Sequence, residues 1–306
     1  MRRHLAWQVP VVAVALALAG CSGSDASEAG EDADAATTTT VATAEANPLA
    51  DKAAEDYQAY AVEQTGELVR VVKVFTDAVR AGDLQAAQAA YAPSRVPWER
   101  IEPLAGLVEE IDGKVDARVD DFAGVDDPEF TGWHRLEFLL FEKNTTDGGA
   151  PFADQLDRDI ATLNTQMPTL DVTPRDVAVG AAELIEEVSE GKITGEEDRY
   201  SKTDLWDFDA NLQGSKAAID KLTPALQEAD PELLGKINKG FDDLNATLQP
   251  LRRGDGWVLY CTPNDPYPSA RCTGVTVDQP TIDKLKAQLA GLSENVSQVA
   301  GVLGLK

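Results

Sequence analysis

The sequence has little histidine and little basic charge, and each shortage narrows the range of functions. Only 2 of its 306 residues are histidines, and His4 lies in a segment that we expect to be removed. A zinc peptidase of the usual kind needs two histidines one helical turn apart, so that mechanism cannot be assembled here. With 27 basic against 53 acidic residues, the net charge is -26, which repels nucleic acid and attracts cations. Solubility alone would also explain this charge.

The N-terminus lacks an apolar run long enough to be read as a membrane span. Arg2 and Arg3 precede the short apolar stretch 9–19, which is typical of a secretory signal. This stretch leads into Leu-Ala-Gly-Cys21, which resembles a bacterial lipobox. Residues 1–21 are therefore predicted to be a lipoprotein signal peptide, with Cys21 as the lipidation site that anchors the chain to the extracytoplasmic side of a membrane. The alternative is a cleaved, secreted protein in which this cysteine has no such role.

The other two cysteines, Cys261 and Cys272, lie at the ends of one turn-rich loop. In an exported protein, a local disulfide is the natural interpretation of such a pair. A two-cysteine metal clip is less favoured because no histidine or further cysteine is nearby. The polar, threonine-rich residues 22–48 are predicted to form a disordered tether, which leaves residues 49–306 as the folded domain.

The folded domain is predicted to be all-α, because apolar residues recur at helical intervals along most of it. This pattern favours an up-and-down helical bundle or two joined bundles. Only Trp257–Tyr260 resembles a strand. Pro93 and Pro97 are expected to end one helix and begin another, which would put Glu99 and Glu102 near a helix N-terminus. A further acidic helix is expected over residues 112–121.

The stretch Thr131–Phe141 contains the only histidine outside the signal segment. On a helix, His134 and Glu137 are three residues apart, so the imidazole and the carboxylate project side by side. Glu99 and Glu102 have the same spacing, and two such pairs on facing helices would make a carboxylate-rich metal site. The alternatives are a structural histidine packed beside Trp133 and a pair of glutamates on a solvated helix face.

Three separated motifs resemble the imelysin-like domain of EfeO/EfeM-type periplasmic iron-uptake proteins. They are Tyr91–Pro103, Phe130–Glu137 and Thr194–Tyr200, and they occur in the family's order. The resemblance implies two fused up-and-down helical bundles. It also implies a metal site made by His134, Glu137, Glu99, Glu102 and Asp116.

The resemblance implies a non-enzymatic carrier that captures iron outside the cytoplasm and passes it to a membrane iron permease of the EfeU type, often beside a haem-dependent peroxidase of the EfeB type. Carboxylates and one imidazole suit iron and manganese, and they tolerate zinc, copper or calcium. The chain is expected to be the short form, because a tether stands where the long form carries a cupredoxin domain. Lys202 also replaces a histidine that the family often has, which weakens any second metal site near Asp204.

The sequence is also compatible with two other functions. The imelysin family was first classed with metallopeptidases, and a Ser-His-Asp hydrolase is formally possible, although no Gly-x-Ser-x-Gly motif accompanies it. A surface lipoprotein that binds a polysaccharide is the second alternative, since Tyr200 and Trp206 could stack on sugar rings.

Overall fold

The computed structural model describes residues 47–305, so the predictions on the signal peptide, Cys21 and nearly all of the tether lie outside the described residues. The elements are α1 (Pro48–Arg80), α2 (Leu84–Ile101), η1 (Glu102–Leu107), α3 (Glu109–Val115), η2 (Val119–Asp121), α4 (Gly132–Glu137), η3 (Phe138–Glu142), α5 (Ala150–Gln166), η4 (Met167–Thr169), α6 (Pro174–Glu190), η5 (Lys192–Thr194), α7 (Asp204–Ala229), α8 (Pro231–Leu248), η6 (Gln249–Leu251), β1 (Arg252–Arg253), β2 (Gly256–Trp257), α9 (Gln279–Val296) and α10 (Val299–Val302). The predicted all-α class is confirmed, and the strand predicted over Trp257–Tyr260 is limited to one two-residue pairing of β1 with β2.

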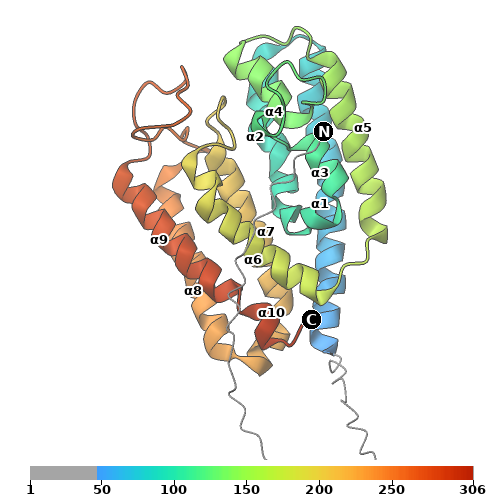
Figure 1. Cartoon of the computed structure of the whole chain (residues 1–306), viewed down its shortest axis with the longest axis vertical. Helices are drawn as coiled ribbons and strands as arrows, with labels where there is room; N and C mark the ends of the chain where they lie inside the picture. Colours follow the sequence, from blue (N-terminus) through green and yellow to red (C-terminus); the bar gives the residue numbers. More distant parts are fainter. Residues whose placement is uncertain (1–46, 306) are drawn as a thin grey trace, which may run out of the picture. The chain divides into compact units, whose positions relative to one another are not determined.

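The helices pack in two groups that share one hydrophobic core (Figure 1). The first group joins α1, α2 and α5, with the short α3 and α4 packed against α5. In the second group α6 packs on α7 and α9, and α8 closes the ring between α7 and α9. Helix α7 connects the groups because it also packs against α1 and α2. None of these described helices is both long and apolar enough to cross a membrane.

Helix α2 continues through Pro93 and Pro97 without interruption, so the predicted break between two helices is wrong. Each proline removes one backbone hydrogen bond, and the packing of α2 against α1 and α7 outweighs this loss. Helices α2 and α7 come so close at Gly214 that a Cβ there would lie 2.2 Å from the carbonyl oxygen of Arg100. As a consequence Glu99 and Glu102 lie at the C-terminal end of a helix, where the helix dipole does not favour negative charge.

The predicted helix over residues 112–121 is also wrong beyond Val115, where α3 ends. Asp116 follows directly and is buried, whereas Asp120 lies on η2 with an exposed side chain. The start of α4 abuts this point, since Gly132 has a φ of 75° and a Cβ there would meet the carbonyl oxygen of Val115 at 2.2 Å. Only glycine allows this approach, and it brings Asp116 beside the helix that carries His134.

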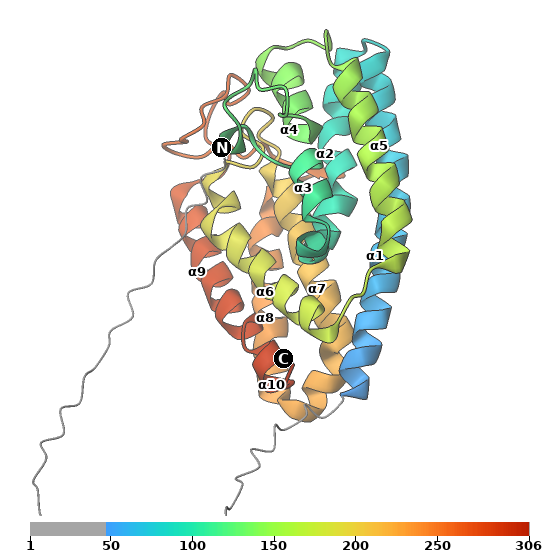
Figure 2. The same cartoon turned by 45° about the vertical axis from the view of Figure 1, so that its right-hand side comes forward.

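The predicted disulfide between Cys261 and Cys272 is present, and it closes the loop between β2 and α9. Both views show this loop at the same end of the folded domain as α4 (Figures 1 and 2). The guanidinium of Arg271 from the loop lies 4.6 Å from the ring of Phe141, which follows α4. The loop therefore packs onto the part of the chain that carries the central histidine.

Candidate functional site

The buried imidazole of His134 lies between two groups of carboxylates. Its Nδ1 is 3.2 Å from Oε2 of Glu137, as the predicted i, i+3 spacing on α4 requires. Its Nε2 faces the other way and lies 3.4 Å from Oδ1 of Asp116 and 3.6 Å from Oε1 of Glu197. These three atoms lie close enough together to coordinate one metal ion, and all three residues are buried. Ligands at right angles around a small cation are about 3 Å apart, so little movement would complete a cation site.

The guanidinium of Arg95, on α2, occupies the centre of this arrangement. Its Nη1 donates to Oδ1 of Asp116 and lies 3.4 Å from Nε2 of His134. Its Nη2 donates to Oε1 of Glu197 at 3.0 Å and also bonds the carboxylate of Glu99. In this structure a side-chain cation thus contacts the same three atoms that could bind a metal ion.

The other predicted pair, Glu99 and Glu102, surrounds a second buried cation rather than the imidazole. The Nζ of Lys192 donates to Glu99 at 3.0 Å and to both carboxylate oxygens of Glu102 at 2.9 Å. The amide of Asn211 donates to the same two carboxylates. Arg95 joins Glu99 to the imidazole cluster, so all five predicted residues belong to one polar network, but Glu99 and Glu102 do not touch the histidine ring.

Glu137 is held in place from the segment that connects α6 to α7. Its Oε1 accepts hydrogen bonds from the backbone N–H groups of Tyr200 (2.9 Å) and Ser201 (2.7 Å), while its Oε2 faces the imidazole. A carboxylate on the far nitrogen of a metal-ligating histidine fixes the orientation of the ring and raises its basicity. The geometry of Glu137 therefore suits ring support.

Sequence reasoning did not assign several residues of the network. Glu197 and Asp198 lie in the third family motif, and Arg95 lies in the first. The motifs therefore included these residues, but helical spacing does not connect them to His134. Asp204 and Asp207 line the buried face of α7, and each has one carboxylate oxygen without a hydrogen-bond partner.

Acids outnumber bases among the buried residues that the structure describes. Seven carboxylates are buried, against three permanent cations and one imidazole. The carboxylates are Glu99, Asp116, Glu137, Glu197, Asp198, Asp204 and Asp207, and the cations are Arg95, Lys192 and Lys202. Buried carboxylates are costly unless they are paired with cations. With fewer cations than carboxylates, the network is short of positive charge.

The pKa shifts divide the network into ionised and protonated parts. Burial would raise the pKa of Asp116 and of Glu197, but the nearby cations and hydrogen bonds from His134 hold both well below the usual value. Burial would lower the pKa of His134, yet its carboxylate partners raise it well above normal. Burial and the charge of Asp198 raise the pKa values of Asp204 and Asp207. Asp116, Glu197 and the imidazole of His134 are thus charged, while protons on Asp204 and Asp207 neutralise part of the remaining negative charge.

A cleft of about 550 Å³ leads from the surface to this network. Seven of its lining residues are acidic, namely Glu102, Asp112, Asp116, Asp121, Glu183, Glu187 and Glu197. Arg118 is the one basic residue in the lining, and it donates to Oε2 of Glu197. Clefts lined by one sign of charge concentrate counter-ions, so this cleft favours the entry of cations.

The stability of the metal-free protein should fall as the pH rises from 5 to 8. Burial and the charge of Asp116 raise the pKa of Asp112 to about 7, and burial and Glu99 raise that of Glu102. In the unfolded chain such groups lose their protons near pH 4, so the folded state binds more protons between pH 4 and their folded pKa values. The protons that the folded state binds therefore stabilise it at acidic pH, and this stabilisation is lost as the pH rises through about 7. We expect a drop in the melting temperature of at least about 3 °C. A flat melting temperature between pH 5 and 8 would contradict these protonation states.

Comparison with known proteins identifies the family. The imelysin family model matches residues 53–296. The chain is 46% identical over 250 residues to the iron uptake system component EfeO of Escherichia coli O157:H7, and 45% identical to the proteins of the same name from Escherichia coli K12 and Shigella flexneri. Each match covers 81% of this chain and 63% of the relative, so the chain spans less than two thirds of the length of these relatives. On these two findings, the chain belongs to the imelysin family.

Proposed function

We propose that this protein binds an iron ion outside the cytoplasm and passes it to a membrane iron permease of the EfeU type. The observation that carries the proposal is the shortage of positive charge in the buried network, which adjoins an acidic cleft. The relatives named as iron uptake system components support iron as the substrate. A haem-dependent peroxidase of the EfeB type is a second candidate partner.

The proposed ligands are Nε2 of His134 and the facing carboxylates of Asp116 and Glu197. Two carboxylates and one imidazole are hard or borderline donors, which suit iron in either oxidation state. Glu137 would hold the ring from Nδ1. Arg95 would have to leave the imidazole cluster when iron enters. Glu99 and Glu102 would take part indirectly, because Glu99 binds Arg95 and both glutamates bind Lys192.

The proposed site is suited to a carrier, which has to release its substrate. Glu197 is held on both carboxylate oxygens by side-chain cations, Arg95 on one and Arg118 on the other. These cations compete with a bound metal and would return to the carboxylates when it leaves. We further propose that residues 1–21 act as a lipoprotein signal with Cys21 as the anchor, that residues 22–48 form a tether and that residues 49–306 form the iron-binding domain at the membrane surface.

Neither alternative function gains support from the site. His134 is the single histidine of the described residues, so a second imidazole for a zinc-peptidase motif does not come from this part of the chain. The aromatic side chains considered for sugar binding are half-buried and packed: Tyr200 lies 5.4 Å from the ring of Phe138, and Trp206 covers the backbone of Gly256. We therefore propose a non-enzymatic role.

Titration of metal-free protein with iron tests the proposal. The indole of Trp98 donates to Oδ2 of Asp116 at 2.8 Å, so its fluorescence should change when that carboxylate binds a metal ion. We expect saturable binding of one iron, as Fe²⁺ without oxygen or as Fe³⁺ citrate, with matching calorimetric and fluorescence isotherms. In Trp98→Phe the fluorescence change should shrink while the calorimetric binding persists. Failure of both iron forms to bind saturably would overturn the proposed function.

A further inference from the structure

The segment Tyr200–Lys202 lies between the candidate site and the disulfide-closed loop. On one side, the N–H groups of Tyr200 and Ser201 donate to the carboxylate of Glu137, which contacts the imidazole of His134. Lys202 has a φ of 60°, a left-handed conformation that non-glycine residues adopt only when their surroundings hold them there. The fold therefore needs contacts that fix this short segment.

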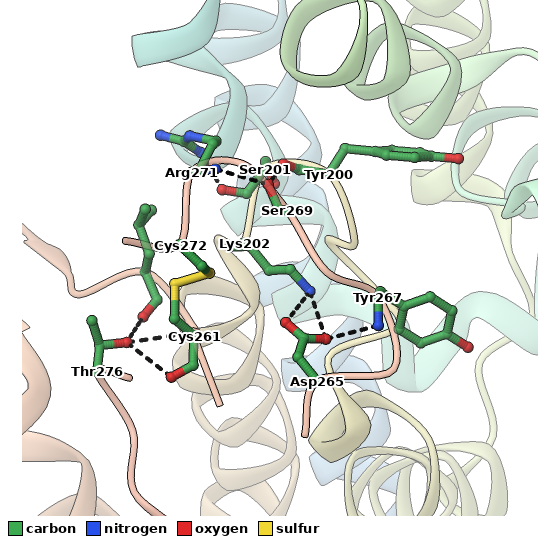
Figure 3. The surroundings of a disulfide bond; sticks show 11 residues. Tyr200, Ser201, Lys202, Cys261, Asp265, Tyr267, Ser269, Arg271, Cys272 and Thr276 are labelled. Atoms are coloured by element: carbon green, nitrogen blue, oxygen red, sulfur yellow. Dashed lines mark hydrogen bonds and ion pairs between the residues drawn. A yellow bond between two sulfur atoms is a disulfide. The ribbon is translucent and has the colours of Figure 1, made fainter. Parts of the chain in front are cut away.

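The loop and the residue before it supply these contacts to three consecutive carbonyl groups, and Figure 3 shows the two contacts made from within the loop. The hydroxyl of Ser269 donates to the carbonyl of Tyr200 at 3.1 Å, and the guanidinium of Arg271 donates to that of Ser201. The backbone N–H of Tyr260, immediately before Cys261, donates to the carbonyl of Lys202 at 2.8 Å. Each residue of the segment is thus held by its carbonyl from the loop side.

Two side chains of neighbouring residues are held by the same loop. The buried ammonium of Lys202 donates to Asp265 at 3.0 Å, as Figure 3 shows. The guanidinium of Arg199 lies 4.4 Å from the ring of Tyr267. Asp265 and Tyr267 are both inside the ring closed by Cys261 and Cys272, so the loop contacts the segment along its whole length.

The disulfide restricts the conformations open to this loop. Residues 262–271 contain no helix and no strand, and most of their side chains are partly or fully exposed. A loop without a core of its own has high conformational freedom, and a covalent link between its ends removes much of it. Loss of the link would therefore loosen the contacts of Ser269 and Arg271 to the carbonyl groups of the segment together.

We propose that the loop closed by Cys261–Cys272 positions the iron site, with Ser269, Arg271 and Asp265 as positioning residues. They act through the Tyr200–Lys202 backbone on Glu137, and through Glu137 on the ring of His134. The inference rests on the proposed iron-binding function. Direct hydrogen-bond partners of a metal ligand typically change metal affinity by about 10- to 100-fold when they are removed, and the loop residues act one contact farther out, so we expect effects at the lower end of this range.

The test compares iron titrations of four variants with the wild-type protein. We expect Cys261→Ser/Cys272→Ser to bind Fe²⁺ about 10-fold more weakly under anaerobic conditions. Leu289→Ala is the matched control, because it opens a cavity in the core at α9, a helix that contributes no group to the network, and so lowers stability without touching the segment. Its iron affinity should equal that of the wild type even though its melting temperature falls. The third variant, Ser269→Ala, should weaken binding, and Ser269→Thr, which keeps the hydroxyl, should restore it.

A spectroscopic readout separates positioning from general stability. The absorption spectrum of bound Co²⁺, used as a probe metal, should change in the double cysteine variant and stay the same in Leu289→Ala. If the wild type binds iron and both the double variant and Ser269→Ala bind it with unchanged affinity and spectrum, the inference is wrong while the proposed function stands. If the wild type itself does not bind iron, the proposed function fails first. Should the double variant fail to fold, the Ser269 pair still decides the question.

Discussion

Replacing Glu197 with glutamine is expected to weaken iron binding by about 100-fold or more, because the change removes one of the two proposed anionic ligands. Oε1 of Glu197, Nε2 of His134 and Oδ1 of Asp116 are the three atoms that lie close enough together to bind one metal ion. Glutamine has the same shape but no charge, and its amide nitrogen cannot ligate a cation. Calorimetric titration with Fe²⁺ and with Fe³⁺ citrate measures the loss.

The neighbouring residue provides a matched control for this prediction. Glu196 lies one position earlier, is only partly buried, and reaches Arg118 at 3.7 Å without contacting His134. Glu196→Gln removes the same charge from the same segment, so any long-range electrostatic effect should appear in both variants. Binding should fall by less than about 3-fold in the control, since Glu196 contributes no ligand and solvent weakens the effect of a partly exposed charge. Equal losses in the two variants would show that total charge, and not coordination, determines the affinity.

The sequence predicts the local part of the site and misses the part that depends on the tertiary fold. His134 and Glu137 share one helical turn, and their contact follows from the helical period alone. Glu197 lies more than sixty residues downstream in a turn, and only the packing of the connection between α6 and α7 brings it to the ring. Helical periodicity says nothing about such a contact, although a family motif included the residue.

The prolines of α2 explain another error of the sequence analysis. A break at Pro97 would give Glu99 and Glu102 a helix N-terminus as their source of positive charge. In the continuous helix they lie at the opposite end, and the charge comes instead from the side chains of Arg95 and Lys192. Sequence patterns for metal ligands consist of acids and histidines, so they do not include the buried arginine and lysine. These two buried cations are the basis for the proposal that a metal ion exchanges with a side-chain cation.

Replacing Arg95 with methionine is expected to lower the melting temperature of the metal-free protein by roughly 10 °C. The buried guanidinium contacts Glu99, Asp116 and Glu197, and its Nε is 3.4 Å from Asp207. Removing one partner of a buried ion pair leaves uncompensated charge and costs about 3–5 kcal/mol, which corresponds to a shift of this size in a domain of more than 200 residues. The control is Arg135→Met, because Arg135 is half-buried and packs on aromatic rings such as that of Phe152, at 4.8 Å.

Iron should restore much of what Arg95→Met loses, and this result distinguishes cation exchange from a purely structural arginine. At the proposed site, iron would have to displace the guanidinium from Asp116 and Glu197, so part of its binding free energy would be used to break those contacts. The variant has nothing to displace, and its carboxylates gain a cation that they otherwise lack. The rise in melting temperature on adding saturating iron should therefore be larger in Arg95→Met than in the wild type, whereas Arg135→Met should show the wild-type rise. An equal or smaller rise in Arg95→Met would mean that the arginine and the metal do not compete for the same carboxylates.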